Sequence, residues 1–240
     1  MTLTEQLRLV NADAFYLSSS ENESSLPDQI ASVVRHRIIH DDIKPGAPIR
    51  ERQLASELDV SRTPLRDALK ILAQEKLVAL IPNKGAVVAD YSLDDIADML
   101  LVYTELDKLG GRLACRMANE TDFLRVERQI GRMDVATANR DKIEYFRANQ
   151  AFHMAIIRAS RSKTTIELHA KLSLRLHRIR YLSILENDQW MGRSDEHLDM
   201  LQALRDHDAE RFAQIQEDHF SVAWRLIDGW ANRNGNALAR

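Results

Sequence analysis

The sequence predicts a mainly α-helical protein with two domains, an N-terminal winged helix-turn-helix and a C-terminal antiparallel bundle of about six helices. Three observations support this fold class. A short helix and a second helix that starts at Ser61 are joined by a brief turn, at helix-turn-helix spacing. Two β-rich runs flank Pro82–Gly85, as in a hairpin. Beyond Pro82 the chain has no proline, and helical patterns follow one another with short connections.

The N-terminal region changes from a polar segment to a helical one. Residues 1–25 are predicted to form a flexible arm, because Ser18 to Ser25 is polar and acidic and cannot pack a core. A helix from Pro27 to His40 has apolar residues at helical spacing. Lys44 to Pro48, with two prolines and a glycine, then breaks the chain. Residues 26–90 are therefore predicted to be the winged helix-turn-helix domain.

The helix that starts at Ser61 has an apolar side and a basic side. Ser61 occupies the position of a helix cap, and Pro64 follows in the first turn, where its missing N–H costs nothing. The apolar side would face the core and contains Leu65, Ala68, Leu69 and Leu72. The opposite side contains Arg62, Thr63, Arg66 and Lys70.

Such a helix suits docking onto DNA by its N-terminal end. Its N–H groups and the Ser61 hydroxyl can bind phosphate, while Arg62 and Arg66 can reach phosphates or guanine edges. The alternative is an ordinary amphipathic helix with a solvated basic face. The preceding helix, Glu51 to Leu58, and the hairpin at residues 77–89 favour DNA binding, because together they complete a winged helix-turn-helix.

Residues from about 27 to 90 resemble the DNA-binding domain of GntR-type bacterial transcription regulators. The matching segments are residues 43–46, 51–58, 60–69, 77–78 and 84–88. The resemblance implies that the operator is contacted by Arg52, Ser61, Arg62, Thr63 and Arg66, with Gly85 against the minor groove and Lys84 as a further wing contact. The expected partner is double-stranded operator DNA. A homodimer on a short palindrome is expected, because one small winged module reads only a half-site.

Composition places the chain among globular proteins without general affinity for polyanions. The formal net charge is −3, and basic residues outnumber acidic ones only locally, between Lys44 and Lys84. The single cysteine, Cys115, excludes an intrachain disulfide. No apolar run approaches the roughly 20 residues that span a bilayer. We therefore expect a cytoplasmic protein without a membrane partner.

From residue 91 to residue 231 the pattern predicts a second, all-helical domain for effector binding and dimerisation. Its first helix starts at Ser92–Asp95 and runs to about Ala118. Helices restart at Asn119 and Asn139, and residues 160–163 form another break. The remaining elements are a helix at 164–187, a loop at 190–194, and helices at 195–206 and 208–230. Residues 232–240 are predicted to be a flexible tail.

Three of these helices each place one imidazole on their apolar side. His153, His197 and His219 recur in line with apolar neighbours, and Asn149 lies one turn before His153. Facing side chains on bundle helices commonly build metal sites, and neutral imidazole suits zinc and its neighbours. For any one of them alone, a core histidine with a hydrogen-bonded neighbour is the simpler interpretation.

Residues 92–230 resemble the FCD ligand-binding domain of the FadR branch of GntR regulators, through Phe152–His153, Glu196–Leu198 and the histidine of the last helix. The resemblance implies a divalent metal, zinc first and nickel or manganese next, held by His153, His197 and His219. Asn149 stands where the family usually has an aspartate. The metal would help to bind a small organic-acid effector, and the chain would be a repressor.

The effector-binding pattern departs from the family at Tyr103, where members that anchor an organic acid often have an arginine. Arg175 and Arg178 are the predicted substitutes.

Two other functional classes stay open at this point. A metal-dependent hydrolase would need an acid or base beside the metal. Glu196 and Asp218 neighbour the histidines in sequence but are expected to be turned about 100 degrees away on their helices. A metal-free dimeric regulator with a different effector is the other alternative.

Overall fold

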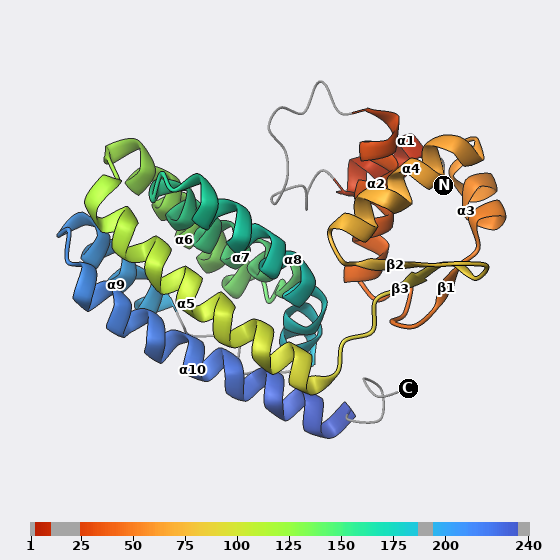
Figure 1. Cartoon of the computed structure of the whole chain (residues 1–240). Helices are drawn as coiled ribbons and strands as arrows, with labels where there is room; N and C mark the ends of the chain where they lie inside the picture. Colours follow the sequence, from red (N-terminus) through yellow and green to blue (C-terminus); the bar gives the residue numbers. More distant parts are fainter. Residues whose placement is uncertain (1–2, 11–24, 187–193, 235–240) are drawn as a thin grey trace. The chain divides into compact units, whose positions relative to one another are not determined.

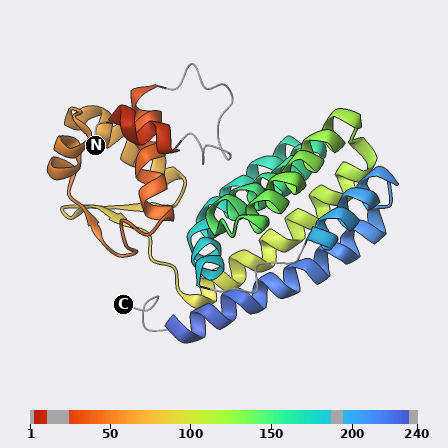
Figure 2. The same ribbon diagram turned by 180° about the vertical axis from the view of Figure 1, so that it is seen from behind.

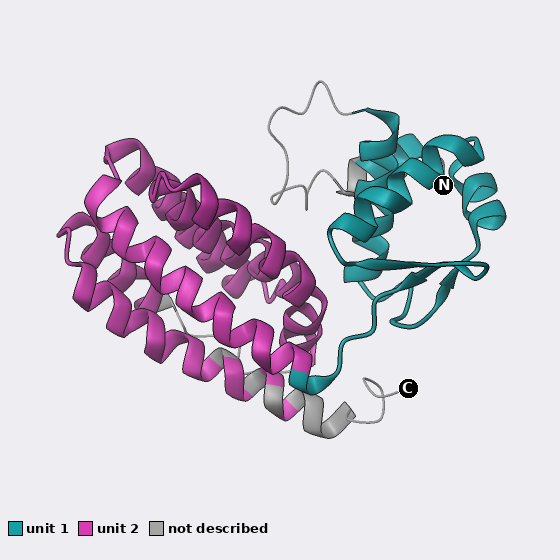
Figure 3. Cartoon of the chain, viewed as in Figure 1, with its two compact units in different colours: residues 1–94, 236–240 teal, residues 95–235 magenta. Residues whose placement is uncertain are grey.

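The computed structural model describes residues 3–10, 25–186 and 194–234, and these form two compact units. The first unit extends from the N-terminus to Asp94, and the second covers Asp95–Gly235 (Figure 3). The division falls a few residues beyond the boundary at 90/91 that the sequence predicted. The fold class is confirmed: the described chain is mainly helical, with one small sheet in the first unit (Figure 1).

The first unit contains the helix-turn-helix and its wing. Its helices are α1 (Leu3–Val10), α2 (Leu26–Ile39), α3 (Glu51–Leu58) and α4 (Arg62–Gln74). The buried side chains of α2, α3 and α4 form its core, and those that are at most 1% exposed include Ile30, Val34, Leu58, Leu65, Leu69 and Leu72. These are the apolar positions at helical spacing, so the pattern of the sequence accounts for the packing.

The wing is a three-stranded antiparallel sheet rather than a hairpin of two strands. The strands are β1 (Pro48–Ile49), β2 (Val78–Ile81) and β3 (Gly85–Val88), in the order β1-β3-β2. Pro48 pairs with Val87, so the chain break at residues 44–48 ends in a strand that the sequence analysis missed.

The range predicted to be a flexible arm begins with a helix. α1 packs on α2, where the Gln6 amide oxygen accepts hydrogen bonds from the Arg37 guanidinium at 2.9 and 3.1 Å. Ser25 belongs to α2 as its cap, because its hydroxyl and the Asp28 carboxylate form a capping box. The polar remainder of the predicted arm, residues 11–24, lies outside the described residues.

The second unit is the six-helix bundle (Figures 1 and 2). Its helices are α5 (Leu93–Met117), α6 (Glu120–Ala138), α7 (Lys142–Ala159), α8 (Lys163–Leu185), α9 (Ser194–Arg205) and α10 (Ala209–Asn234). Asn119, Asp141 and Ser162 cap α6, α7 and α8 through their side chains. The predicted loop at 190–194 lies outside the described residues except for Ser194, which begins α9, and most of the predicted tail lies outside them too.

Two glycines bring α5 close to its neighbours. A Cβ on Gly110 would lie 2.3 Å from the Ile157 side chain of α7, and one on Gly111 would lie 1.9 Å from the Phe212 ring of α10. Real Cβ atoms do not approach other atoms so closely, so only glycine fits here without movement. Asp107, which is buried in the bundle, lies about one turn before Gly110 on the same helix.

Candidate functional site

The N-terminal part of α4 presents an exposed basic surface. Since Leu65 and Leu69 are buried, Arg62 and Arg66 point outward, with 59% and 58% of their side chains accessible. Ser61 is the cap residue by position and has an extended backbone, as predicted. Its hydroxyl, however, makes no capping hydrogen bond within the described residues. It is therefore available to a phosphate.

One carboxylate draws the two arginines together. Glu51, the first residue of α3, accepts a hydrogen bond from Arg66 Nε at 2.8 Å, and its same oxygen lies 3.7 Å from Arg62 Nη2. All three side chains are solvated, so these pairs contribute little to stability. They do hold both arginine heads near the start of the helix that would enter the groove.

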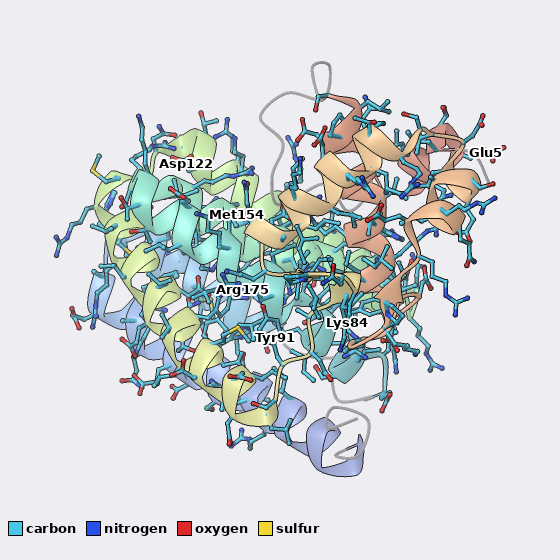
Figure 4. The ribbon with its side chains drawn as sticks, turned by 45° about the vertical axis from the view of Figure 1, so that its right-hand side comes forward. Glu5, Lys84, Tyr91, Asp122, Met154 and Arg175 are labelled. Atoms are coloured by element: carbon cyan, nitrogen blue, oxygen red, sulfur yellow. The ribbon has the colours of Figure 1, made fainter. Side chains whose placement is uncertain are left out.

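The other predicted DNA contacts are also on the surface. Gly85 has φ +79°, a left-handed conformation that favours glycine, and it starts β3 after the turn at Pro82–Lys84. Lys84 lies at this turn (Figure 4). All predicted contact residues are exposed, namely Arg52, Ser61, Arg62, Thr63, Arg66, Lys84 and Gly85. Their contact with DNA stays a prediction.

The bundle brings the three predicted histidines together. His153 on α7, His197 on α9 and His219 on α10 are 1%, 1% and 5% exposed. One nitrogen of each ring lies within 4.8 Å of the others. The ring centroids of His197 and His219 are 4.9 Å apart, and that of His153 is 5.3 Å from His219. Small side-chain rotations would place three nitrogens around one ion.

Two carboxylates face the outer nitrogens of this cluster. His153 Nδ1 lies 3.3 Å from Asp107 Oδ2, and His219 Nδ1 lies 2.7 Å from Glu196 Oε2. A carboxylate at Nδ1 fixes the tautomer that presents Nε2 to a metal. The expectation that Glu196 would be turned away was wrong, because a glutamate side chain is long and α9 packs against α10. Asn149 Oδ1 lies 3.0 Å from His197 Nε2, so the predicted fourth ligand borders the cluster.

The electrostatics keep the imidazole neutral and the carboxylate charged. Burial lowers the pKa of His153, and the nearby Asp107 charge only partly opposes this. Burial alone would raise the pKa of Asp107, but His153 and His169 hold it well below its usual range. A neutral ring beside an ionised carboxylate is the state that a metal ligand requires.

Asp107 is part of a buried polar network that sequence reasoning missed. Its Oδ1 lies 3.5 Å from His169 Nε2 of α8, and its Oδ2 accepts a hydrogen bond from Gln216 Nε2 of α10 at 2.9 Å. The signal was present, since His169, Ser173, Leu176 and Arg180 recur at helical spacing on α8 and are all buried. The sequence analysis singled out no residue of that stripe.

The predicted effector residues separate into one buried group and two peripheral ones. Tyr103 is fully buried, and its hydroxyl accepts a hydrogen bond from Arg180 Nη1 at 3.0 Å. Arg175, labelled in Figure 4, and Arg178 lie on the same helix, α8, and are half-buried. The arginine in contact with Tyr103 is thus Arg180.

Comparisons with known proteins agree with this two-part structure. The family model described as "Bacterial regulatory proteins, gntR family" matches residues 26–88, and that of the FCD domain matches residues 98–222. The HTH-type transcriptional repressor RspR of Escherichia coli K12 is 23% identical over 191 residues, which cover 80% of this chain and 84% of RspR. The gluconate operon transcriptional repressor of Bacillus subtilis is 30% identical over 151 residues, 63% of this chain and 62% of that protein.

A solved structure shares the fold. The structure titled E. coli McbR/YncC superposes with a TM-score of 0.73 at 20% identity and covers 85% of this chain and 99% of that one. Within the described part of the chain, none of the helices has the length and apolar character needed to cross a membrane.

A winged helix-turn-helix followed by a six-helix bundle is the architecture of a DNA-binding transcription regulator rather than of an enzyme. The chain belongs to the GntR family of bacterial regulatory proteins, in the FadR-type branch that has a C-terminal FCD domain.

Proposed function

We propose that this regulator is a repressor whose affinity for its operator is controlled by a small carboxylate metabolite bound at a metal site in the second unit. The observation that carries the proposal is the buried cluster of His153, His197 and His219, with ring nitrogens within 4.8 Å of one another. The repressor assignment rests on the likeness to two relatives that are named repressors, RspR and the gluconate operon repressor.

Zinc is the proposed metal, with nickel and manganese as the next candidates. Three neutral imidazoles form a donor set that zinc accepts, and Asn149 would add an amide oxygen without charge. Asp107 and Glu196 would act as outer partners that orient the rings. When bound, the metal would supply a positive charge and open coordination positions for an anionic ligand.

The metal proposal is tested by elemental analysis of protein purified without an imidazole column or chelator. We expect about one zinc per parent chain and a large loss in His197→Ala. His207→Ala is the matched control, because His207 is an exposed histidine of the same unit, outside the cluster. Zinc well below one per chain in the parent would favour the alternative, a metal-free regulator.

Operator recognition is proposed to rest on the exposed arginines of α4. Arg66→Ala should weaken specific operator binding by about 1–3 kcal/mol if the arginine makes a bidentate base contact. Lys70→Ala, one turn further along the same exposed face, is the control and should have a smaller effect that does not depend on sequence. Equal losses for both variants in a gel-shift titration would contradict the assignment of base contacts.

The proposed functional state is a homodimer on a short imperfect palindrome in the cytoplasm. One winged unit offers a single α4, which reads one half-site. Measurement of molar mass in solution, with and without a duplex containing one or two half-sites, tests this. A single chain bound to the full palindrome would contradict it.

Effector control requires that the metabolite bind one state of the protein more tightly than another. We propose that the change reaches the DNA-binding unit through residues 89–92, which connect β3 to α5. A thermal-shift screen of organic acids, repeated on His197→Ala, tests the site. A true effector should stabilise the parent more than the variant and change operator affinity. Equal stabilisation of both proteins with unaltered DNA binding would refute metal-linked control.

A further inference from the structure

Arg180 is a buried cation that has no anionic partner among the described residues. Its residue is 8% exposed, its Nη1 donates to the Tyr103 hydroxyl at 3.0 Å, and its guanidinium carbon lies 5.1 Å from the Tyr103 ring centroid. Within the ranges that the structure describes, no acidic side chain forms an ion pair with it. Burial raises the pKa of Tyr103, so the phenol is neutral and cannot compensate the charge.

Two other arginines that are partly buried, Arg35 and Arg132, have carboxylate partners. Arg35 pairs with Glu75 at 2.6 Å, and Arg132 pairs with Glu144 at 2.7 Å. A buried charge is costly unless it is paired and hydrogen-bonded. Arg180 departs from this rule among the described residues, and the carboxylate of a bound ligand would supply the missing partner.

The Arg180–Tyr103 pair lies in the same interior as the histidine cluster. The Tyr103 ring meets the edge of Phe220 at 5.7 Å, and the Phe220 ring lies 5.7 Å from His153 and 5.8 Å from His219. On another side, the Tyr103 ring centroid is 4.6 Å from that of His169. The Phe220 ring therefore separates Tyr103, which is the hydrogen-bonding partner of Arg180, from two of the proposed metal ligands.

Several buried polar atoms in this interior could form further hydrogen bonds. Among the described residues, His153 Nε2, His169 Nδ1 and Gln216 Oε1 are buried and have no hydrogen-bonding partner. Buried polar groups are nearly always paired, so such a group of exceptions is typical of a place that holds water or a ligand. These atoms come from α7, α8 and α10, which also carry Arg180 and two of the three histidines.

We propose that Arg180 binds a carboxylate of the effector, at a point separate from the metal. Tyr103 would assist, because its hydroxyl oxygen accepts from Arg180 and its own proton can then be donated to the same anion. Arg180 on α8 thus takes the role first assigned to Arg175 and Arg178. The effector class that follows is an acid with two separated polar ends, such as a linear dicarboxylate. This inference rests on the proposed metal and effector site.

The test compares matched ligands on zinc-loaded, full-length protein. Linear dicarboxylates from succinate to pimelate and the monocarboxylates of equal chain length are titrated by calorimetry. At least one dicarboxylate should bind the parent about tenfold or more tightly than its monocarboxylate, as a charge-assisted pair predicts. Arg180→Gln should abolish this preference at unchanged zinc content, whereas Arg178→Gln, a half-buried arginine of the same helix, should keep it.

Two results would overturn the inference. One is the absence of any dicarboxylate preference in the parent, and the other is a preference that survives in Arg180→Gln. The zinc content distinguishes failure of this inference from failure of the proposed function. Stoichiometric zinc, together with a dicarboxylate preference that does not depend on Arg180, refutes only the present inference. Absence of zinc together with a preference that depends on Arg180 refutes only the metal.

The melting temperature of the ligand-free protein tests whether Arg180 has a purely structural role. In Arg180→Met the buried charge is replaced by an apolar chain of similar length, so the melting temperature of the ligand-free protein should stay constant or rise. A decrease of more than about 5 °C would show that Arg180 is satisfied within the chain and would overturn the proposal.

Discussion

Gly111 of α5 lies against Phe212 of α10. We therefore predict that Gly111→Ala destabilises the protein, whereas a glycine-to-alanine substitution in a helix ordinarily stabilises it. Replacing a helical glycine by alanine normally stabilises a helix by about 0.5–1 kcal/mol. At Gly111 the new Cβ would lie 1.9, 2.4 and 2.8 Å from three atoms of the Phe212 ring, which is fully buried. A rigid ring in that position has little room to move.

The expected magnitude follows from two opposing terms. Overpacking of a core typically costs about 1–3 kcal/mol, and so tight an approach belongs at the upper end of that range. Subtracting about 1 kcal/mol of helix propensity leaves a net loss of about 2 kcal/mol for Gly111→Ala. Gly131→Ala on α6 is the matched control, because its Cβ would meet nothing within 4 Å, and this variant should gain about 0.5–1 kcal/mol.

The change in the free energy of unfolding for Gly110→Ala should lie between the changes for Gly111→Ala and Gly131→Ala. Its Cβ would lie 2.3 Å from Ile157 Cδ1, which is the far end of a flexible side chain and can move at low cost. Each kcal/mol corresponds to about 2–4 °C in melting temperature for a protein of this size.

Tryptophan fluorescence is a suitable assay, because Trp190, Trp224 and Trp230 all belong to the second unit. Urea unfolding followed by this signal therefore reports on the bundle. Phe212→Leu should partly rescue Gly111→Ala, with a coupling energy of about 1 kcal/mol or more in a double-mutant cycle. If Gly111→Ala and Gly131→Ala shift stability in the same direction by the same amount, the close approach of α5 to α10 is wrong.

Three further predictions concern charge and protonation. Glu51→Gln should strengthen binding to random-sequence DNA at fixed salt in an anisotropy titration, because a carboxylate that neutralises Arg62 and Arg66 is removed; unchanged or weaker binding would contradict this. Burial lowers the pKa of His153 from 6.5, so the unfolded chain takes up the proton first. The free energy of unfolding of metal-free protein should therefore fall as pH decreases from about 7 through 6.5, by at most about 1.4 kcal/mol per pH unit for this group. A parallel urea titration of His153→Gln should show a shallower fall, and identical slopes would count against the neutral buried ring. Burial raises the pKa of Cys115 to about 11, so a thiol reagent at neutral pH should label it rapidly only after unfolding; fast labelling of the native protein would be inconsistent with its burial.

The sequence was sufficient for features that depend on local pattern. The apolar spacing of Leu65, Leu69 and Leu72 determined which side of α4 is buried, and therefore which arginines are exposed. The cap residue Asn119 marked a helix start, because its side chain satisfies backbone N–H groups within the next turn. The apolar stripes also indicated that His153, His197 and His219 face the interior of the bundle, whereas their gathering at one site was implied by the resemblance to the FCD domain.

Features that depend on contacts between distant helices could not be predicted. β1 has only two residues, too few to show a period, and exists because Pro48–Ile49 meets β3. The pairing of Tyr103 with Arg180 joins residues 77 positions apart. Asp107 lies 3.3 Å from His153 on a helix that also approaches α7 at Gly110 and α10 at Gly111, and no spacing within α5 reveals how close a neighbouring helix will come.

The position of Tyr103 and Asp107 on α5 has a consequence for how such regulators diversify. α5 is an unbroken helix from Leu93, directly after the segment that leaves the wing, and these two residues lie about three to four turns along it. A displacement imposed on them would be delivered to the connecting segment by the covalent chain itself. Under the proposed function, a different winged domain joined at residue 93 would be connected by the same helix to the proposed effector site.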